Sequence, residues 1–548
     1  MSHSHDHPFG SARFASDAEI RRAFKAKGVL PVAYSRGRFL SHSRDAGMLL
    51  ISGAGAGKFT SVLAHLMGTL ARAPGPVRMV VIDPKGEMFL TFGAGLIHQG
   101  AHVYLIDAYG ATGAASHSLN LFSHLTPSSR TLVADCDRAA LNWIPDGGNG
   151  DSRFFEIKAR TWLAAIMRGL VHADGTLSLP RLRELVAMIV SAPDAWAEMS
   201  SALAALGEPD LAGTFGEMLK MSEDGQRTYQ SVLGEITNAL APASDPNIQK
   251  AFVGGDEADV SFDILTEDRN QPIILFIVFP AELTVRNAAV LRQTISTLRT
   301  TKHRKPHAPR IHVVIDEAGQ LGRASELLEM YTFDRGPGLT PLCVFQDYGQ
   351  IRRNLGESAA TTLTASADLE LYLGGGVSDL ETAEYLSRKL GDQTLQLADT
   401  LTRERAARAK REAIHAVLYE GADPFKTGMV MRALDAETQH VRKQARRLMQ
   451  PSEIMSLPRG NALVVPSGYS IDPFVAPVRP YFTRPEYAGL YGPNPYFDRD
   501  MGSVRVRTRL GYRRRRVIRE AVPERFKAFP QYKHGEWEFI EGYRPKLK

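Results

Sequence analysis

The segment SGAGAGKFT (residues 52–60) combines small residues with a lysine in a pattern that can bind phosphate. Small residues let successive backbone N–H groups wrap an anion, and a helix that starts here presents its positive end to it. The complete phosphate-loop pattern is G-x-x-x-x-G-K-[ST]. Ser52 replaces its first glycine, and Phe59 replaces the hydroxyl residue that binds Mg²⁺, with Thr60 one position late. We therefore predict a nucleotide-binding loop formed by Gly53, Gly55, Gly57, Lys58, Phe59 and Thr60.

A strand-like run that ends in two acids, IHVVIDE (residues 311–317), supplies a second part of such a site. In phosphate-loop ATPases, one acid at this position holds Mg²⁺ and a neighbouring acid polarises the attacking water. We assign Asp316 to the metal, with Thr60 as a further candidate metal ligand, and Glu317 to the water. Lys58 would bind the β- and γ-phosphates. ATP and Mg²⁺ are therefore the expected cofactors.

Three further positions carry polar groups that the same chemistry could use. Gln346 follows an apolar run, where it would sense the γ-phosphate or, alternatively, cap a loop. Arg335 is a candidate arginine finger for a neighbouring subunit, with a plain surface charge as the alternative. The turn DPKGE (83–87) ends another run, at the edge where open α/β sheets bind ligands.

Short apolar runs alternate with helix-like segments through most of the chain. This pattern predicts βαβ units and an α/β fold with a mainly parallel sheet. The runs are MLLIS (48–52), VRMVVID (77–83), AHVYLIDA (101–108), PIILFIVFP (272–280), RIHVVIDEA (310–318), PLCVFQD (341–347), LELYLGG (369–375) and NALVVPSG (461–468).

The strand pattern is interrupted in the middle of the chain, where apolar residues recur at helical spacing. A second stretch, residues 401–449, is rich in Arg, Lys and Ala and is expected to be partly helical. The predicted divisions are an N-terminal segment (1–45), a discontinuous nucleotide-binding domain (46–126 and 255–487), an inserted all-α domain (127–254) and a linker with a basic, aromatic-rich tail (488–548).

The composition narrows the class of protein. The 548 residues include two cysteines, which excludes a disulfide framework and a cysteine-rich metal site. No run of about 18 apolar residues occurs, so no transmembrane segment is expected in this chain. The net charge is +6, yet residues 503–548 alone carry fourteen Lys and Arg against five Asp and Glu.

The basic C-terminal region predicts an anionic partner. Arginines pair with phosphates and aromatic rings stack on bases, so nucleic acid is the first expectation, with Arg513, Arg514, Arg515 and Arg516 as its contacts. Two alternatives stay open, an anionic lipid surface and an edge strand that docks on a partner protein.

Several segments, in this order along the chain, resemble the signature motifs of the conjugative type IV secretion coupling proteins, the TraG/TraD-like DNA transfer ATPases. The resemblance covers about residues 10–487 and corresponds to the cytoplasmic part of that family, without its N-terminal transmembrane helices. The similar segments are GSARFASDAEIRRA (10–23), VVIDPKGE (80–87), LNLF (119–122), VVIDEAGQLGRASELLE (313–329), residues 357–394 and LMQPSEIMSLPRGNALVV (448–465).

The resemblance implies a RecA-like P-loop NTPase core with an inserted all-α domain. It also implies a homo-hexamer that binds single- or double-stranded DNA and delivers a relaxase or effector protein to a type IV secretion channel at the inner membrane. Such a protein would be cytoplasmic and peripheral at the cytoplasmic face of the bacterial inner membrane. Two rival interpretations remain: a non-hydrolysing adaptor with a degenerate phosphate loop, which Phe59 favours, and a double-stranded DNA translocase.

Overall fold

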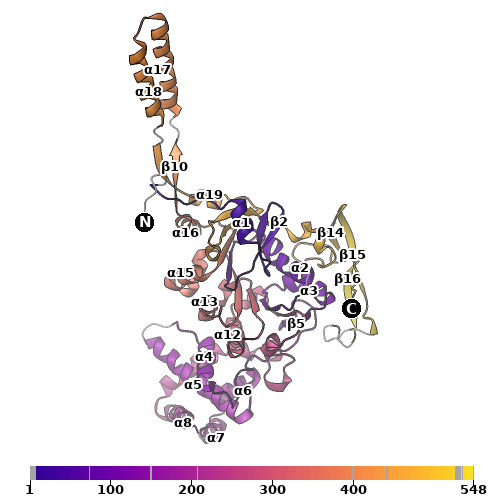
Figure 1. Cartoon of the computed structure of the whole chain (residues 1–548). Helices are drawn as coiled ribbons and strands as arrows, with labels where there is room; N and C mark the ends of the chain where they lie inside the picture. Colours follow the sequence, from indigo (N-terminus) through magenta and orange to yellow (C-terminus); the bar gives the residue numbers. More distant parts are fainter. Residues whose placement is uncertain are drawn as a thin grey trace.

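The computed structural model describes residues 8–546 except 73–74, 148–150, 207, 398–399, 440–441, 525–526, 528–531 and 533–534. Within these residues, the largest sheet has nine strands in the order β13-β12-β9-β3-β8-β7-β4-β6-β5 (Figure 1). From β9 to β5 all neighbours are parallel, while β12 and β13 are joined antiparallel at one edge. The predicted α/β class with a mainly parallel sheet is confirmed. The strands are β3 (Met48–Ile51), β4 (Arg78–Ile82), β5 (His102–Asp107), β6 (Ile273–Val278), β7 (Ile311–Ile315), β8 (Leu339–Phe345), β9 (Leu369–Leu373), β12 (Asn461–Val465) and β13 (Phe474–Pro477).

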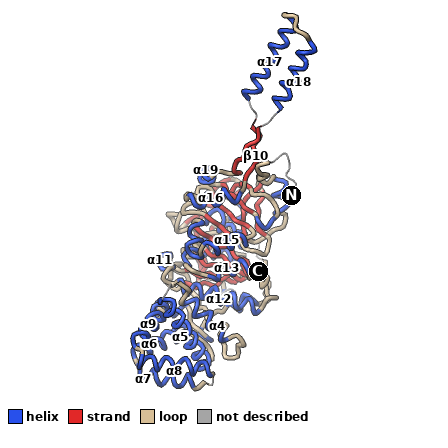
Figure 2. The backbone as a smooth tube through the Cα atoms, turned by 90° about the vertical axis from the view of Figure 1, so that its left-hand side faces the viewer, coloured by secondary structure: helices blue, strands red, loops and turns tan. Residues whose placement is uncertain are grey.

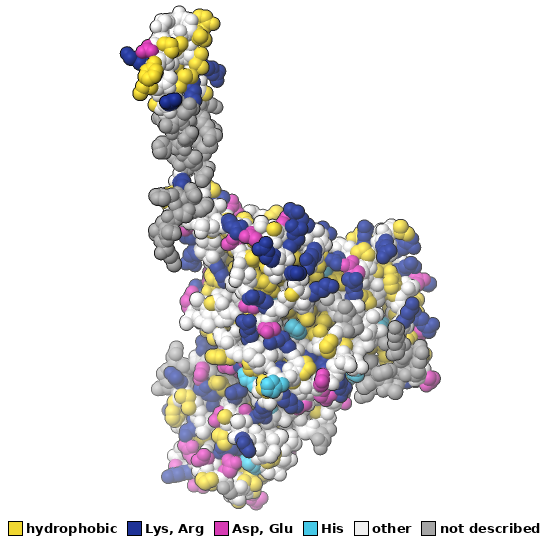
Figure 3. Space-filling view, in the orientation of Figure 1, with side chains coloured by type: hydrophobic (Ala, Val, Ile, Leu, Met, Phe, Trp, Pro, Cys, Tyr) yellow, Lys and Arg dark blue, Asp and Glu magenta, His cyan; other side chains and the backbone are white. Residues whose placement is uncertain are grey.

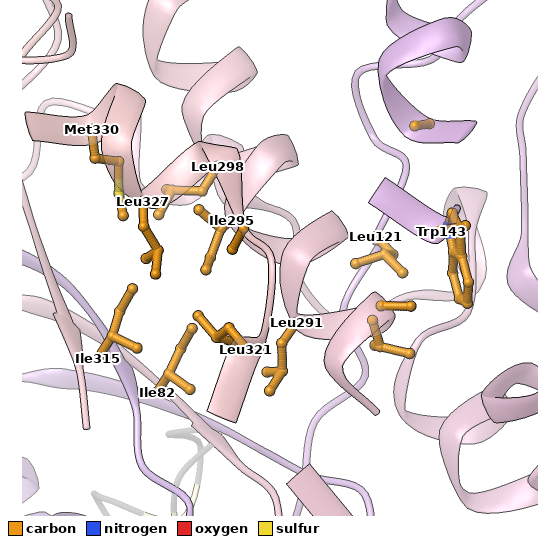
Figure 4. Packing of buried hydrophobic residues seen from close by; sticks show 14 of the residues in the cluster. Ile82, Leu121, Trp143, Leu291, Ile295, Leu298, Ile315, Leu321, Leu327 and Met330 are labelled. Carbon is orange, nitrogen blue, oxygen red and sulfur yellow. The ribbon is translucent and has the colours of Figure 1, made fainter. Parts of the chain in front are cut away.

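The central strands are buried on both faces, which explains why their sequences are continuously apolar. In β4, every residue is buried, and alternate side chains enter opposite hydrophobic clusters. One face is covered by α12 (Ala288–Arg304) and α13 (Ser325–Thr332). Figure 4 shows Ile82 and Ile315 pointing from the sheet toward the side chains of these helices.

The opposite face is covered by α2 (Ala64–Arg72), α3 (Glu87–His98) and an N-terminal hairpin. The hairpin strands β1 (Leu30–Ser35) and β2 (Arg38–His42) pair antiparallel. Leu30 and Leu40 lie in the same cluster as α2 and α3. The segment 1–45, expected to stand apart from the nucleotide-binding domain, therefore contributes to its core.

Between β5 and β6 the chain forms a separate group of helices. They surround a long helix, α5 (Asp151–Asp174), and bury Trp162, Trp196 and Phe215. Asn142 joins this group to α12 by donating from Nδ2 to Oε1 of Gln293 at 3.1 Å. The α-helices of the group are α4 (Leu132–Trp143), α5 (Asp151–Asp174), α6 (Leu179–Ser191), α7 (Pro193–Ala204), α8 (Pro209–Asp224), α9 (Gln226–Ala239) and α10 (Pro246–Ala251).

A helical hairpin projects from the opposite end of the molecule (Figures 1 and 2). Its helices α17 (Thr400–Tyr419) and α18 (Pro424–Gln439) stand on a two-stranded stem, β10 (Asp392–Leu397) paired with β11 (Arg442–Arg447). The exposed apolar side chains at its end include Leu418, Tyr419, Phe425 and Met429. The region 401–449 is thus largely a projection rather than part of the compact nucleotide-binding domain, because its helices pack on each other.

The C-terminal part is folded, which corrects the expectation of a linker and a tail. We call residues 489–546 the C-terminal module. Its strands β14 (Ser503–Thr508), β15 (Gly511–Ala521) and β16 (Glu536–Ile540) form an antiparallel sheet with β15 in the middle. The alternation of valine with arginine places Val504 and Val506 on one buried face. The module packs on α3, where Gly492 N–H donates to the Thr91 carbonyl at 2.8 Å.

In the part of the chain that the structure describes, no helix combines the length and the apolar sequence needed to span a bilayer.

Candidate nucleotide-binding site

The phosphate loop joins β3 to a helix at the carboxyl edge of the sheet, where ligands of open α/β sheets bind. Gly55 and Gly57 have φ values of 75° and 90°, in the left-handed region that favours glycine. Gly53 N–H donates to the Gly376 carbonyl at 2.7 Å, so the loop also lies close to a second backbone segment. Ser52 has a negative φ, and the backbone therefore accepts a side chain where the pattern has its first glycine.

The helix after the loop begins with a π-helical turn, η1 (Phe59–Leu63). Ala64 N–H donates to the Phe59 carbonyl, a bond that encloses one residue more than an α-helical turn does. The Phe59 side chain enters the core, where it is 7% exposed and its ring centroid lies 5.8 Å from that of Tyr481. The ring is therefore not available to a ligand at the loop, and any contact of Phe59 with a nucleotide would come from its backbone.

Thr60 supplies the hydroxyl that the position of Phe59 lacks. Its Oγ1 donates to the Gly57 carbonyl at 3.3 Å. A Cβ built on Gly57 would lie 3.1 Å from that Oγ1 and 3.3 Å from the Oγ of Ser61. The π-helical turn thus brings two hydroxyls next to the loop, although the sequence places them one and two residues late.

Asp316 and Glu317 follow β7 at the same edge of the sheet. Burial raises the pKa of Asp316 above its ordinary value, while the positive charge of Lys58 opposes this rise. Glu317 has a φ of 52°, a left-handed conformation that is strained for a residue other than glycine. Its carboxylate accepts a hydrogen bond from the side-chain amide of Gln320. Lys58, Asp316 and Glu317 therefore meet where phosphate, metal and water would lie.

Asp83 and Lys85 reach this place from the turn after β4, which the sequence placed at the ligand edge without a role for either side chain. Asp83 is buried and accepts a hydrogen bond from Met88 N–H at 2.7 Å. Burial and the neighbouring Asp316 raise the pKa of Asp83 to about 7. Lys85 forms an ion pair with Glu317. The signal that could have identified Asp83 is an acid directly after an apolar strand, the same signal that identified Asp316.

Gln346 and Arg335 lie at opposite ends of β8. Gln346 follows the carboxyl end, directly after Phe345, whose carbonyl accepts from the N–H of Ser52 at 2.9 Å. The side chain of Gln346 is exposed at the edge that carries the loop. Arg335 is exposed before the amino end of the strand, away from the loop of its own chain. The structure therefore brings Gln346 to the site and leaves Arg335 outside it.

The four arginines 513–516 lie on β15, where they pair with β14, while β16 pairs with the following residues of β15, from Val517 to Ala521. Successive side chains point to opposite faces. Arg514 donates from Nη2 to Asp500 at 2.6 Å, and Arg516 contacts Glu541 at 3.3 Å. Figure 3 shows Lys and Arg side chains distributed over this module with acidic side chains between them. The run is therefore partly neutralised.

The residues at the carboxyl edge fit a nucleotide with Mg²⁺. The glycine conformations leave the backbone open to phosphate, and Lys58 stands at the N-terminus of a helix. Among the described residues, no group of three or more His, Cys, Asp and Glu side chains forms a metal site by itself. Mg²⁺ usually binds through one or two carboxylates together with substrate phosphates, which Asp316 and Thr60 would allow. With Glu317 beside them, the arrangement suits hydrolysis of a phosphoanhydride.

Comparison with known proteins agrees with this geometry. The family model described as "Type IV secretory system Conjugative DNA transfer" matches residues 13–417. The conjugal transfer protein TraG of Rhizobium radiobacter is 23% identical over 409 residues, which cover 70% of this chain and 57% of TraG. The chain therefore spans little more than half the length of that relative.

Solved structures of the bacterial conjugative coupling protein TrwB share the fold. The unbound monoclinic form of TrwBΔN70 has a TM-score of 0.59 at 19% identity and covers 85% of this chain and 93% of its own. TrwB with ADP and Mg²⁺ gives the same TM-score, identity and coverage. TrwB with a non-hydrolysable ATP analogue has a TM-score of 0.58 at 18% identity, over 86% of this chain and 96% of its own. Because the family match extends over most of the sequence, the chain belongs to the type IV secretory system conjugative DNA transfer family.

Proposed function

We propose that this chain is an ATP-driven coupling protein of conjugative DNA transfer. It binds ATP with Mg²⁺, hydrolyses it, and uses the energy to bring DNA with a relaxase, or an effector protein, into a type IV secretion channel. Membership of the family supports a role in conjugative DNA transfer. The residues of the site support the hydrolysis of ATP. The protein would act at the cytoplasmic face of the inner membrane, next to the channel.

The observation that carries the proposal is the meeting of Lys58, Asp316 and Glu317 at the carboxyl edge of one parallel sheet. Lys58 would neutralise the β- and γ-phosphates, Asp316 would hold Mg²⁺, and Glu317 would polarise the water. Gln346, exposed at the same edge, would respond to loss of the γ-phosphate.

The position of Phe59 supports hydrolysis over a purely structural role for the loop. The ring lies in the core and does not fill the space beside the phosphates. The hydroxyl of Thr60 lies next to Gly57, where it can serve the metal instead. Phe59 therefore does not prevent Mg²⁺ from binding, because Thr60 could serve as the hydroxyl ligand in its place.

Arg335 is proposed to act across a subunit interface of a homo-hexamer. Its exposed side chain lies away from the loop of its own chain, as a finger inserted into a neighbour would require. Arg513, exposed on β15, is proposed to contact DNA phosphates.

The test is steady-state ATP hydrolysis by the purified chain, with and without single- and double-stranded DNA, at low and moderate salt. Turnover that DNA stimulates, and that Lys58→Ala abolishes, supports the motor. Stimulation by double-stranded DNA alone would favour the translocase. A folded protein that binds ATP and shows no turnover under any condition would contradict the motor and favour the adaptor.

Phe59→Thr separates the motor from the adaptor directly. If Thr60 already serves the metal, the substitution should not raise turnover. A large gain in turnover, at unchanged ATP affinity, would show that the native loop is deficient in hydrolysis.

A further inference from the structure

We propose that the C-terminal module and the segment before it form a pocket for the purine base of the nucleotide. This inference rests on the proposed function, because it extends the site that holds the phosphates. It assigns a binding role to residues 481–512, which lie outside the part of the chain that the family model matches.

A cavity of about 450 Å³ opens beside the start of the helix that follows the phosphate loop. Thr60 forms its wall on the loop side. Five aromatic side chains also line it, together with Asp498, Val504 and Arg505: Tyr481, Phe482, Tyr491, Phe497 and Tyr512. Aromatic residues at this density, around a space next to a phosphate-binding loop, favour a flat aromatic ligand over a polar one.

The position of the cavity suits the base because of the direction in which a nucleotide leaves the loop. In a phosphate loop the backbone N–H groups surround the α- and β-phosphates and the lysine reaches the β- and γ-phosphates. With Lys58 in that role, the α-phosphate would lie next to the first helical turn. The sugar and base must then extend past Thr60, which forms the cavity wall.

The module is also fastened to the phosphate site at several points. The hydroxyl of Tyr496 donates to the Lys85 carbonyl at 2.8 Å. Asn494 Nδ2 donates to Oε1 of Glu87 at 2.7 Å. These hydrogen bonds hold the C-terminal module in place against the turn that carries Asp83 and Lys85. The cavity and the phosphate site can therefore belong to one nucleotide-binding site.

The exposed rings supply the stacking surface. Phe482 is 38% exposed and Phe497 64% exposed, although both could be buried by a ligand in the cavity. The guanidinium of Arg505 lies 4.2 Å from the ring centroid of Tyr512, so a planar cation is already stacked at the rim. Asp498 also lines the cavity and provides a carboxylate to accept from an amino group or a ribose hydroxyl.

The test compares ATP with inorganic triphosphate, which carries the same phosphates without a base, by calorimetric titration of the full chain. Base–aromatic stacking corresponds to about 5- to 150-fold in affinity. We expect the wild type to bind ATP tighter than triphosphate by a factor in this range. The double variant Phe482→Ala/Phe497→Ala should lose most of that preference while its affinity for triphosphate stays unchanged.

The controls separate this inference from the function on which it rests. Phe425→Ala removes an exposed ring at the end of the helical hairpin and should leave both affinities unchanged. Lys58→Ala should weaken both ligands, because it acts on the phosphates. If the double variant keeps the full preference for ATP, the pocket is overturned and the phosphate site stands. If neither ligand binds the wild type, both proposals are overturned.

Discussion

The Nζ atom of Lys85 lies 3.6 Å from Oε1 of Glu317, so the turn after β4 holds the acid that would polarise the attacking water. The amide of Gln320 holds the other carboxylate oxygen, and the backbone of Glu317 is strained at a φ of 52°. Two side chains therefore hold this carboxylate, Lys85 from a distant segment and Gln320 from the same turn. This makes Lys85 a positioning residue for the proposed hydrolysis.

Replacing Lys85 by glutamine should lower kcat for ATP hydrolysis about ten-fold, with little change in KM, because misplacement of a catalytic group acts mainly on the chemical step. Lys85→Arg should restore most of the activity, since it keeps the charge near Glu317. Steady-state kinetics of the two variants check this. Equal kcat in Lys85→Gln and the wild type would show that the ion pair has no part in turnover.

Asp83 should make the stability of the protein depend on pH. Its pKa is about 7 in the folded chain, against about 3.9 in an unfolded chain. Because the folded state binds this proton more tightly, the group stabilises the fold most at low pH, and the contribution is lost as pH rises from about 4 to about 7.

Asp83→Asn removes this proton equilibrium. The unfolding free energy of the wild type should therefore fall relative to that of the variant by up to about 4 kcal/mol between pH 4 and 7, and then level off. Urea unfolding at a series of pH values measures the difference. A difference that does not change with pH would mean that Asp83 ionises normally in the folded protein.

Phe59→Ala should destabilise the fold by about 3–5 kcal/mol, the usual cost of removing a buried phenyl ring. The reason is that the ring packs in the core against Tyr481. Chemical denaturation measures the loss, and Phe154→Ala, which removes a ring that is 54% exposed, is the control. A loss below about 1 kcal/mol for Phe59→Ala would place the ring outside the core.

Arg513→Gln should weaken DNA binding more than Arg514→Gln does. Arg514 already engages Asp500 and Ser503 within the module, whereas the guanidinium of Arg513 is exposed. Removing one arginine that neutralises a phosphate should make the slope of log K against log salt shallower by about 0.9 for double-stranded DNA. Fluorescence anisotropy at several salt concentrations gives that slope. Equal effects of both substitutions would contradict this ranking.

The sheet and the acids at its edge could be predicted because their signals are local. A buried parallel strand needs only a short apolar run, and an acid such as Asp316 at its end marks the ligand edge. The apolar pattern alone predicted an α/β fold. The resemblance to the coupling proteins, now confirmed, added the expectation of a RecA-like core with an inserted all-α domain. The roles of Gln346 and Arg335 remain predictions.

The remaining features depend on interactions between distant segments. Val504 and Val506 are buried because β14 packs against the short helical turns Tyr481–Thr483 and Pro485–Tyr487. The arginines that alternate with these valines made the sequence look like an exposed basic tail. The ring of Phe59 packs in the core against Tyr481, more than 400 positions later, a contact that no local pattern reveals. The helical hairpin was only partly predicted from the sequence. Its two helices pack on each other and not on the hydrophobic core, so they lack the regular spacing of apolar residues that marks a core-facing helix.

The hairpin acts geometrically as a lever arm. A helix of the 20 residues in α17 is about 30 Å long. The stem on which it stands begins at Asp392, whose carbonyl accepts from the N–H of Ala12 at 3.0 Å. The stem and the helix together extend about 50 Å from this pivot, so a rotation of about 10° would move the far end by about 9 Å. Small displacements at the edge of the core are therefore magnified at the apolar end that carries Leu418 and Phe425.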